Sequence, residues 1–276
     1  MSITERQLAA FTNDHESNLG SAIAPRYLAG AGDPRHVTHA LRSCGWSLDS
    51  DTLHPAIHMT SPDHGHRLSL GPAGIDPYVW RIDNNYSPPA HWQARFGGST
   101  PAEIVAGLTD AMIRPAPQEP APSVTELLTS RGWQYTSAET GSETLASPDG
   151  IVEMTRYVSP LLGFMGWELD AGHQRGAYGP QQLLWRAHFD DATPAHLLAA
   201  VAAAVCDPAP VLRARFDIDS SDLLTQSAEF AIGDQVVAAH KQRLAEARRH
   251  RPKPPSTPSA PAPALPNTTT TARPTR

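Results

Sequence analysis

Residues 100–117 read TPAEIVAGLTDAMIRPAP, and residues 193–210 read TPAHLLAAVAAAVCDPAP. Both stretches begin with Thr-Pro-Ala and end with Pro-Ala-Pro, and the second starts 93 positions after the first. In each stretch, threonine and proline suit the start of a helix, and apolar residues follow at helical spacing. We therefore expect the same helix design to occur twice in this chain.

Further landmarks recur in the same order before these helices. A Gly-Trp pair, a Ser-Pro-Asp triplet and two single tryptophans each return 86 to 93 positions later. The matched landmarks are Gly45-Trp46 with Gly132-Trp133, Ser61-Pro62-Asp63 with Ser147-Pro148-Asp149, Trp80 with Trp167, and Trp92 with Trp185. A period of about ninety residues is too long for a stacked solenoid unit, so the pattern predicts two tandem copies of one domain.

Each copy has the pattern of an α+β domain. Its first helix ends at the Gly-Trp pair, and in the second copy Ser123 and Glu126 form a capping box at the start of this helix. About four short alternating segments then predict antiparallel strands, and the Thr-Pro-Ala helix closes the copy. The expected fold class is therefore α+β, with two tandem α-β-β-β-β-α domains that pack as a pseudo-dimer.

The changes in composition along the chain suggest its boundaries. We expect a flexible N-terminal segment at 1–25, the first copy at 26–115, a proline-rich linker at 116–122, the second copy at 123–210, a C-terminal helix at 221–250 and a disordered tail at 252–276.

The bulk composition argues against several classes of protein. A net charge of −6 and a pI near 6.1 give no overall positive field that would attract nucleic acid or an anionic membrane. The two cysteines form no CxxC pair, which is typical of a reducing compartment. The N-terminus has no secretory apolar run, and no stretch approaches the roughly eighteen apolar residues that span a membrane. We expect a cytoplasmic protein without a membrane partner.

Several motifs of the first copy match a known family. They are Arg26-Tyr27-Leu28-Ala29-Gly30, Asp33-Pro34, Leu41 with Gly45-Trp46, Ser61-Pro62-Asp63, Trp92 with Phe96-Gly97-Gly98, and Thr100-Pro101-Ala102-Glu103-Ile104. On these motifs, residues 26–115 resemble an actinobacterial domain of unknown function that is named for a Ser-Pro-Asp-Tyr motif, and the second copy resembles it more loosely. His64 and Gly150 stand where that motif has tyrosine. Either the tyrosine hydroxyl is dispensable to any role that the family shares, or these two copies have diverged from the family. The resemblance implies a tandem arrangement and no assigned activity.

Two groups of residues around the predicted turns could carry chemistry. His58, His64 and His66 could meet at a metal, but no carboxylate or thiolate stands at a matching spacing, so solvated histidines are the preferred reading. Asp63 and Asp149 could be catalytic carboxylates. Turn chemistry explains them better, because aspartate in such a triplet bonds to local backbone amides. We therefore expect Ser61, Pro62, Asp63, Ser147, Pro148 and Asp149 to be structural, and we expect no metal and no cofactor.

The six tryptophans form three matched pairs, and we expect most of them in the core. Trp92 and Trp185 lie on alternating segments, and we expect them to be partly exposed. Together with Arg95 and Arg186 they form a candidate binding surface, because aromatic and arginine side chains can stack on a partner.

These observations favour a non-enzymatic binding or adaptor protein with a protein partner. The alternative is a nucleic-acid accessory protein that uses exposed tryptophans and the basic stretch near the end of the chain. The candidate nucleic-acid contacts are Arg243, Arg248, Arg249, Arg251 and Lys253. An unfamiliar hydrolase or metal enzyme is the third hypothesis. The sequence leaves the identity of the partner and the oligomeric state open.

Overall fold

The computed structural model describes residues 3–49, 55–72, 77–84, 91–159, 161, 163–174, 181–215 and 223–252. Its elements, in chain order, are α1 (Glu5–His15), β1 (Leu19–Ala24), the short 3₁₀ helix η1 (Arg26–Leu28), α2 (Arg35–Ser43), β2 (Ser47–Leu48), β3 (Ile57–Thr60), β4 (His66–Leu70), β5 (Tyr78–Asn84), β6 (Gln93–Gly97), α3 (Ala102–Ile113), α4 (Val124–Ser130), β7 (Gln134–Ser137), β8 (Glu143–Ala146), β9 (Val152–Ser159), β10 (Gly163–Gln174), β11 (Gln181–Phe189), α5 (Ala195–Val205), β12 (Val211–Ala214), β13 (Thr225–Gln226), β14 (Phe230–Ala231) and α6 (Gly233–Arg249). The α+β class and the antiparallel sheets are confirmed.

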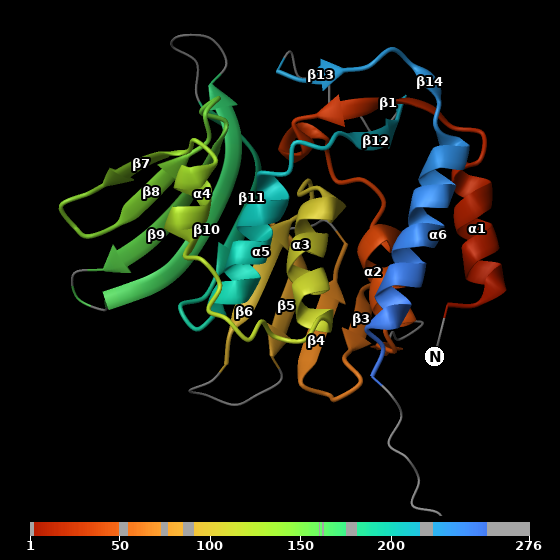
Figure 1. Cartoon of the computed structure of the whole chain (residues 1–276), viewed down its shortest axis with the longest axis horizontal. Helices are drawn as coiled ribbons and strands as arrows, with labels where there is room; N and C mark the ends of the chain where they lie inside the picture. The colour runs from red at the N-terminus through yellow and green to blue at the C-terminus, as the bar shows by residue number, and fades with distance from the viewer. Residues whose placement is uncertain are drawn as a thin grey trace, which may run out of the picture.

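The two repeats share one sheet (Figure 1). Ten of the described strands form one antiparallel sheet, in the order β2-β3-β4-β5-β6-β11-β10-β9-β8-β7. Each repeat contributes a five-stranded meander, one strand more than the four that the sequence indicated. The additional strands, β2 and β7, directly follow the Gly-Trp pairs. The last strands of the two repeats, β6 and β11, join the halves edge to edge.

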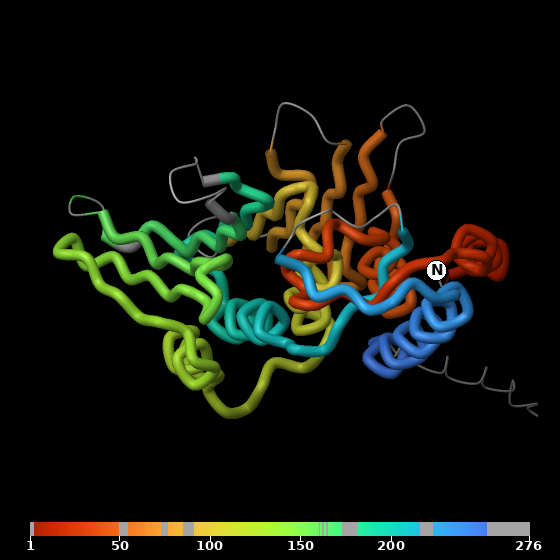
Figure 2. Tube along the Cα trace, turned by 90° about the horizontal axis from the view of Figure 1, so that it is seen from above, coloured from red at the N-terminus to blue at the C-terminus, as the bar shows by residue number. Residues whose placement is uncertain are grey.

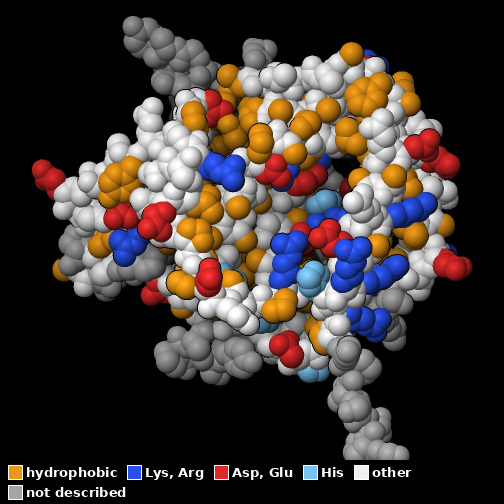
Figure 3. Space-filling model, in the orientation of Figure 1, with side chains coloured by type: hydrophobic (Ala, Val, Ile, Leu, Met, Phe, Trp, Pro, Cys, Tyr) orange, Lys and Arg blue, Asp and Glu red, His pale blue; other side chains and the backbone are white. Residues whose placement is uncertain are grey.

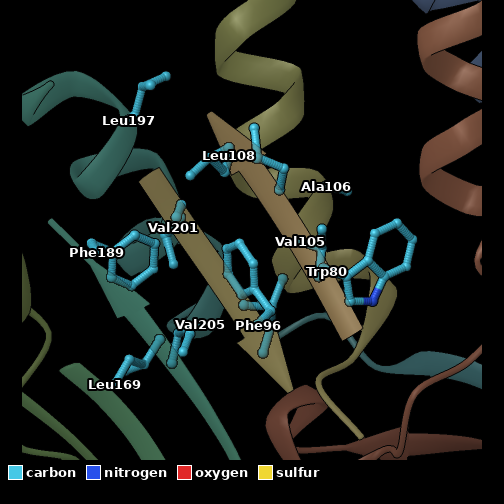
Figure 4. Close-up of a cluster of buried hydrophobic side chains, with 14 of the residues drawn as sticks. Trp80, Phe96, Val105, Ala106, Leu108, Leu169, Phe189, Leu197, Val201 and Val205 are labelled. Carbon is cyan, nitrogen blue, oxygen red and sulfur yellow. The ribbon is translucent and has the colours of Figure 1, made fainter. Parts of the chain in front are cut away.

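The junction between the halves has an approximate twofold axis. Arg95 pairs with His188, which is its own equivalent in the second repeat, and Phe96 pairs with Ala187 while Ala94 pairs with Phe189. The rings of Phe96 and Phe189 meet edge to face with centroids 5.4 Å apart, and Figure 4 shows them beneath α3 and α5. The two repeats are therefore halves of one core rather than independent domains.

The helices lie on one side of this sheet, as Figure 2 shows from above. α3 and α5 cross at Gly107, where a Cβ atom would come within 2.6 Å of the Ala204 Cβ and 3.0 Å of the Ala200 carbonyl oxygen. The predicted capping box begins α4, because Ser123 Oγ accepts from the Glu126 N–H at 3.1 Å and Glu126 Oε2 accepts from the Ser123 N–H at 2.9 Å. All six tryptophans are at most 9% exposed, so they belong to the core.

The segments outside the repeats differ most from the expectation. Residues 1–25 were expected to be a flexible segment, but the described part forms α1 and β1. The Phe11 side chain of α1 is buried against α6, which orders this helix. β1 pairs with β12, β13 and β14, which joins the chain before the first repeat to the chain after the second.

The C-terminal helix is shorter than the predicted range 221–250. α6 begins only at Gly233, because residues 225–226 and 230–231 pair with β1 instead. Of the predicted disordered tail at 252–276, residues 253–276 lie outside the described residues. Within the described residues, no helix is both long enough and apolar enough to cross a membrane.

Candidate functional site

A cavity of about 340 Å³ lies between the first repeat and the helices that flank it. This flank cavity is lined by α1, β12 and α6 and by residues at the N-terminal ends of α2 and α3. Its apolar walls are formed by Phe11, Pro210, Val211, Leu212, Ile232, Val236 and Ala239. Its polar groups come from His15, Asp33, His36, Glu103, Arg213, His240 and Arg243. Figure 3 shows charged and histidine side chains gathered in a hollow beside α6.

The floor of the flank cavity is an ion pair between the buried Arg213 and the partly buried Glu103. Arg213 is 5% exposed, and its Nη1 and Nη2 atoms donate to the two Glu103 carboxylate oxygens at 2.8 and 2.6 Å. Its remaining N–H groups donate to the carbonyl oxygens of Ala29, Gly30 and Leu212. Burial alone would raise the pKa of Glu103, but the hydrogen bonds and charge of Arg213 outweigh burial and lower it to about 2. The pair is therefore fully ionised and fully bonded.

A second ion pair fixes α6 against α3 at the side of the cavity. Arg243 donates from Nη1 and Nη2 to the carboxylate of Asp110 at 2.8 and 2.7 Å, and from Nε to the His36 carbonyl oxygen at 2.8 Å. Burial, together with the charge of Arg243, lowers the pKa of His36 to about 4. The His36 imidazole is thus neutral at neutral pH.

Stacked rings close the end of the cavity between α1, α2 and α6. The Phe11 ring lies between the rings of His15 and His240, with centroid distances of 4.2 and 3.9 Å. His39 Nδ1 lies 3.1 Å from His240 Nε2, so one imidazole donates and the other accepts. Burial is the main reason that the pKa of His39 falls to about 4 and that of His240 to about 3. His15 Nε2 lies 3.3 Å from the carboxylate of Asp33.

The charged groups of this site are already engaged with one another. Each described carboxylate in the lining is already paired with a neighbouring arginine, since Asp33 also binds Arg35 at 2.7 Å. The described lining offers no hydroxyl or thiol. Within the described residues, no three His, Cys, Asp or Glu side chains meet at metal-binding distances. What remains for a ligand is an apolar wall and the neutral imidazoles of His36 and His240.

The structure separates the candidate binding surface into two faces. Trp92 and Trp185 were expected to be partly exposed, but each is only 4% exposed, because they share the helix-covered face of the sheet with the buried Phe96 and Phe189. Arg95 and Arg186 lie on the opposite face of the sheet.

Arg95 and Arg186 already have partners on that face. Arg95 lies over the Tyr78 ring at 4.8 Å and contacts His188 Nδ1 at 3.1 Å. Arg186 binds the carboxylates of Asp170 and Glu168 at 2.6 and 2.8 Å. The four residues therefore do not form one surface.

The basic stretch is also divided. Arg243 was expected to contact nucleic acid, but its pairing with Asp110 holds it inside the protein. Arg248, Arg249 and Arg251 are exposed at the end of α6, and Lys253 lies outside the described residues.

Both Ser-Pro-Asp triplets form the same turn, which we call the first SPD turn (residues 61–65) and the second SPD turn (residues 147–151). In the first, Asp63 Oδ1 accepts from Ser61 Oγ at 2.5 Å and from the Gly65 N–H at 3.0 Å. In the second, Asp149 Oδ1 accepts from Ser147 Oγ at 2.6 Å and from the Ile151 N–H at 3.2 Å. Pro62 and Pro148 are exposed at the turn tips.

The flank cavity was missed at the sequence level, because its residues come from five separate segments. One local signal pointed to a lining element. Thr4 and Gln7 form a capping box, which indicates the start of α1.

A comparison with protein families finds a match in two segments. Residues 60–118 and residues 146–211 each match the family model described as "SPDY: Domain of unknown function (DUF317)". These segments contain both SPD turns and both Thr-Pro-Ala helices, and they exclude α1 and α6. No curated protein and no solved structure matches the chain.

Proposed function

This chain carries two tandem domains of the SPDY family (DUF317), and from its site we propose that it is a non-catalytic binding protein whose flank cavity takes a small, uncharged organic molecule. The observation that carries this proposal is the electrostatics of the cavity. Its charged groups neutralise one another in hydrogen-bonded pairs, and its buried imidazoles are neutral.

The size and the lining of the cavity both support this ligand class. Small-molecule sites usually enclose about 300 to 1,000 Å³ and combine apolar walls with a few polar groups. At about 340 Å³, the flank cavity is at the lower end of this range. An ion would have to displace an existing partner from Arg213 or Glu103, which would leave a buried charge unpaired. A neutral ring with one hydrogen-bonding group can instead use the apolar walls and the His36 imidazole.

Two tryptophan variants on α6 test the proposal with indole as the probe. Val236 lines the cavity, whereas its neighbour Gln235 is exposed and does not. We expect calorimetric titration to show indole binding to the wild-type chain and to Gln235→Trp, and no binding to Val236→Trp. Equal binding by both variants, or no binding by the wild-type chain, would contradict the proposal.

A nucleic-acid role is a second candidate, supported by the exposure of Arg248, Arg249 and Arg251 at one end of α6. If these three side chains neutralise phosphates, a mobility shift should weaken with salt and disappear in the triple serine variant. The loss of Arg243 to an internal ion pair and the acidic net charge make this the weaker candidate.

We also place the protein in the cytoplasm as part of this proposal. Both cysteines are free, and Cys44 is buried with its thiol donating to the Ala247 carbonyl oxygen. Free thiols are usual in a reducing compartment.

A further inference from the structure

The two SPD turns have the same internal hydrogen bonds. They differ in the hydrogen-bond partner that the aspartate has outside the turn. In the second SPD turn, Asp149 Oδ2 accepts a hydrogen bond from the Tyr27 hydroxyl, which comes from η1. The Trp185 indole N–H donates to the Tyr27 backbone carbonyl oxygen at 2.8 Å. A tyrosine from outside the repeat is thus held at its side chain and at its backbone by two residues of the second repeat.

The first repeat has an equivalent aspartate oxygen and an equivalent indole N–H, but neither has such a partner among the described residues. Asp63 corresponds to Asp149, and within the described residues its Oδ2 atom accepts no hydrogen bond. Trp92 corresponds to Trp185, and in the described part of the chain its indole N–H makes none either. The Trp92 ring lies beside His66, with centroids 6.0 Å apart.

A pocket opens beside Asp63, the residue of the first repeat that corresponds to the Asp149 partner of Tyr27. It has a volume of about 140 Å³ and is lined by Trp46, Pro62, Asp63, His66, Met112 and His250, among others. An engineered apolar cavity of about 150 Å³ holds benzene, so a pocket of this size can admit one six-membered ring. Its lining combines apolar side chains for the ring with a carboxylate for a hydroxyl group.

We propose that this pocket at the first SPD turn binds a tyrosine side chain of a partner protein. The phenol hydroxyl donates to Asp63 Oδ2, and the ring lies between Trp46, Pro62 and Met112. The backbone carbonyl of the tyrosine accepts from the indole N–H of Trp92. The second repeat shows the same recognition within the chain itself, with Tyr27 in the role of the partner residue.

The residue before this tyrosine can also be inferred. In the chain's own example, Arg26 precedes Tyr27 and binds Asp207 at 2.6 Å. The first repeat has Arg114 at the position that matches Asp207. Because the charge is reversed, the first SPD turn should favour an acidic residue before the tyrosine.

The probe for this proposal is the peptide acetyl-Glu-Tyr-Leu-amide, titrated calorimetrically into the full chain. We expect it to bind, and we expect replacement of its tyrosine by phenylalanine to weaken binding about tenfold or more, since a hydrogen bond to a charged group is lost. Asp63→Asn keeps an acceptor at Oδ1 and should give a similar loss. The matched variant Asp149→Asn in the second repeat should leave peptide binding unchanged.

Two variants outside the turn show whether binding is lost because the pocket is blocked or because the turn no longer folds. Met112→Trp fills the pocket from α3 and should abolish binding. Arg114→Asp should reverse the preference, so that acetyl-Arg-Tyr-Leu-amide binds better than the glutamate peptide. Equal binding of the tyrosine and phenylalanine peptides, retained binding in Met112→Trp, or no binding at millimolar peptide would each overturn the proposal.

Discussion

Removal of the Arg213 side chain should destabilise the protein strongly. Arg213→Met would leave the partly buried Glu103 carboxylate without its bidentate partner. Breaking a buried ion pair on one side usually costs about 3 to 5 kcal/mol of unfolding free energy. Urea denaturation should show this loss, whereas Arg215→Met, at an exposed position just after β12, should change little. A double variant Arg213→Met with Glu103→Gln should recover part of the stability. Equal effects of the two single variants would argue against a stabilising role for the pair.

The buried histidines should make stability fall in mild acid. His36, His39 and His240 have pKa values of about 4, 4 and 3 in the folded chain, below their ordinary value of 6.5. The unfolded chain therefore takes up protons first as the pH falls. Stability is full above pH 6.5 and decreases from there toward pH 4, by at most about 1.4 kcal/mol per pH unit for each histidine.

Substitution of one histidine checks this pH dependence. His240→Phe keeps a ring against Phe11 but removes one group that must stay neutral. We expect its unfolding free energy to fall less steeply than that of the wild-type chain between pH 6.5 and 4.5, as measured by urea titrations. A His240→Phe slope identical to the wild-type slope would mean that this histidine does not contribute.

At the scale of elements, the crossing of α3 and α5 depends on a residue without a side chain. In Gly107→Ala the new methyl group would lie 2.6 Å from the Ala204 Cβ, so the helices must move apart. Overpacking of this kind costs about 1 to 3 kcal/mol. Thermal unfolding should show a lower midpoint for Gly107→Ala, whereas Ala203→Ser, at an exposed position on α5, should shift it much less. A stabilised Gly107→Ala chain would show that the crossing adjusts freely.

The elements that the sequence predicted well are those whose signals are local. The capping box of Ser123 with Glu126 and the apolar spacing after the Thr-Pro-Ala motifs indicated α4, α3 and α5, because these features depend on neighbours within one turn. β13 and β14 have two residues each and exist only through pairing with β1, so no local pattern could reveal them. The burial of Trp92 likewise depends on which face of the sheet the helices cover.

At the scale of the whole molecule, the junction of the repeats is a symmetric edge contact. The Asp190 N–H donates to the Gln93 carbonyl oxygen at 3.0 Å. His188 lies two positions earlier on the same edge and pairs with Arg95, so its backbone N–H also points toward β6. Arg95 of β6 pairs with His188, its equivalent in β11. Two β11 strands can therefore pair in the same register, with His188 of one chain opposite His188 of the other. We expect residues 123–210, expressed alone, to dimerise in sedimentation experiments, and His188→Pro to prevent this. A stable monomer of the unmodified fragment would contradict the expectation.

The duplication predicted two copies that pack together, but it predicted neither their single shared sheet nor the flank cavity. The landmarks recur in the same order, 86 to 93 positions later, and this recurrence indicated two copies of one domain. The cavity brings Phe11 next to His240, and Glu103 next to Arg213, across separations of more than one hundred residues. No spacing rule connects such positions. Arg243 was therefore assigned to an external partner when its partner is Asp110.

Because β6 and β11 belong to the same polypeptide, the contact between the halves should be insensitive to dilution. Two separate chains with this edge would dissociate at low protein concentration, whereas a covalent connection of about ten residues keeps the second half at a millimolar local concentration. The two halves therefore stay together although their sequences differ. The second half holds Tyr27 of the first half, whereas the pocket beside Asp63 in the first half is open.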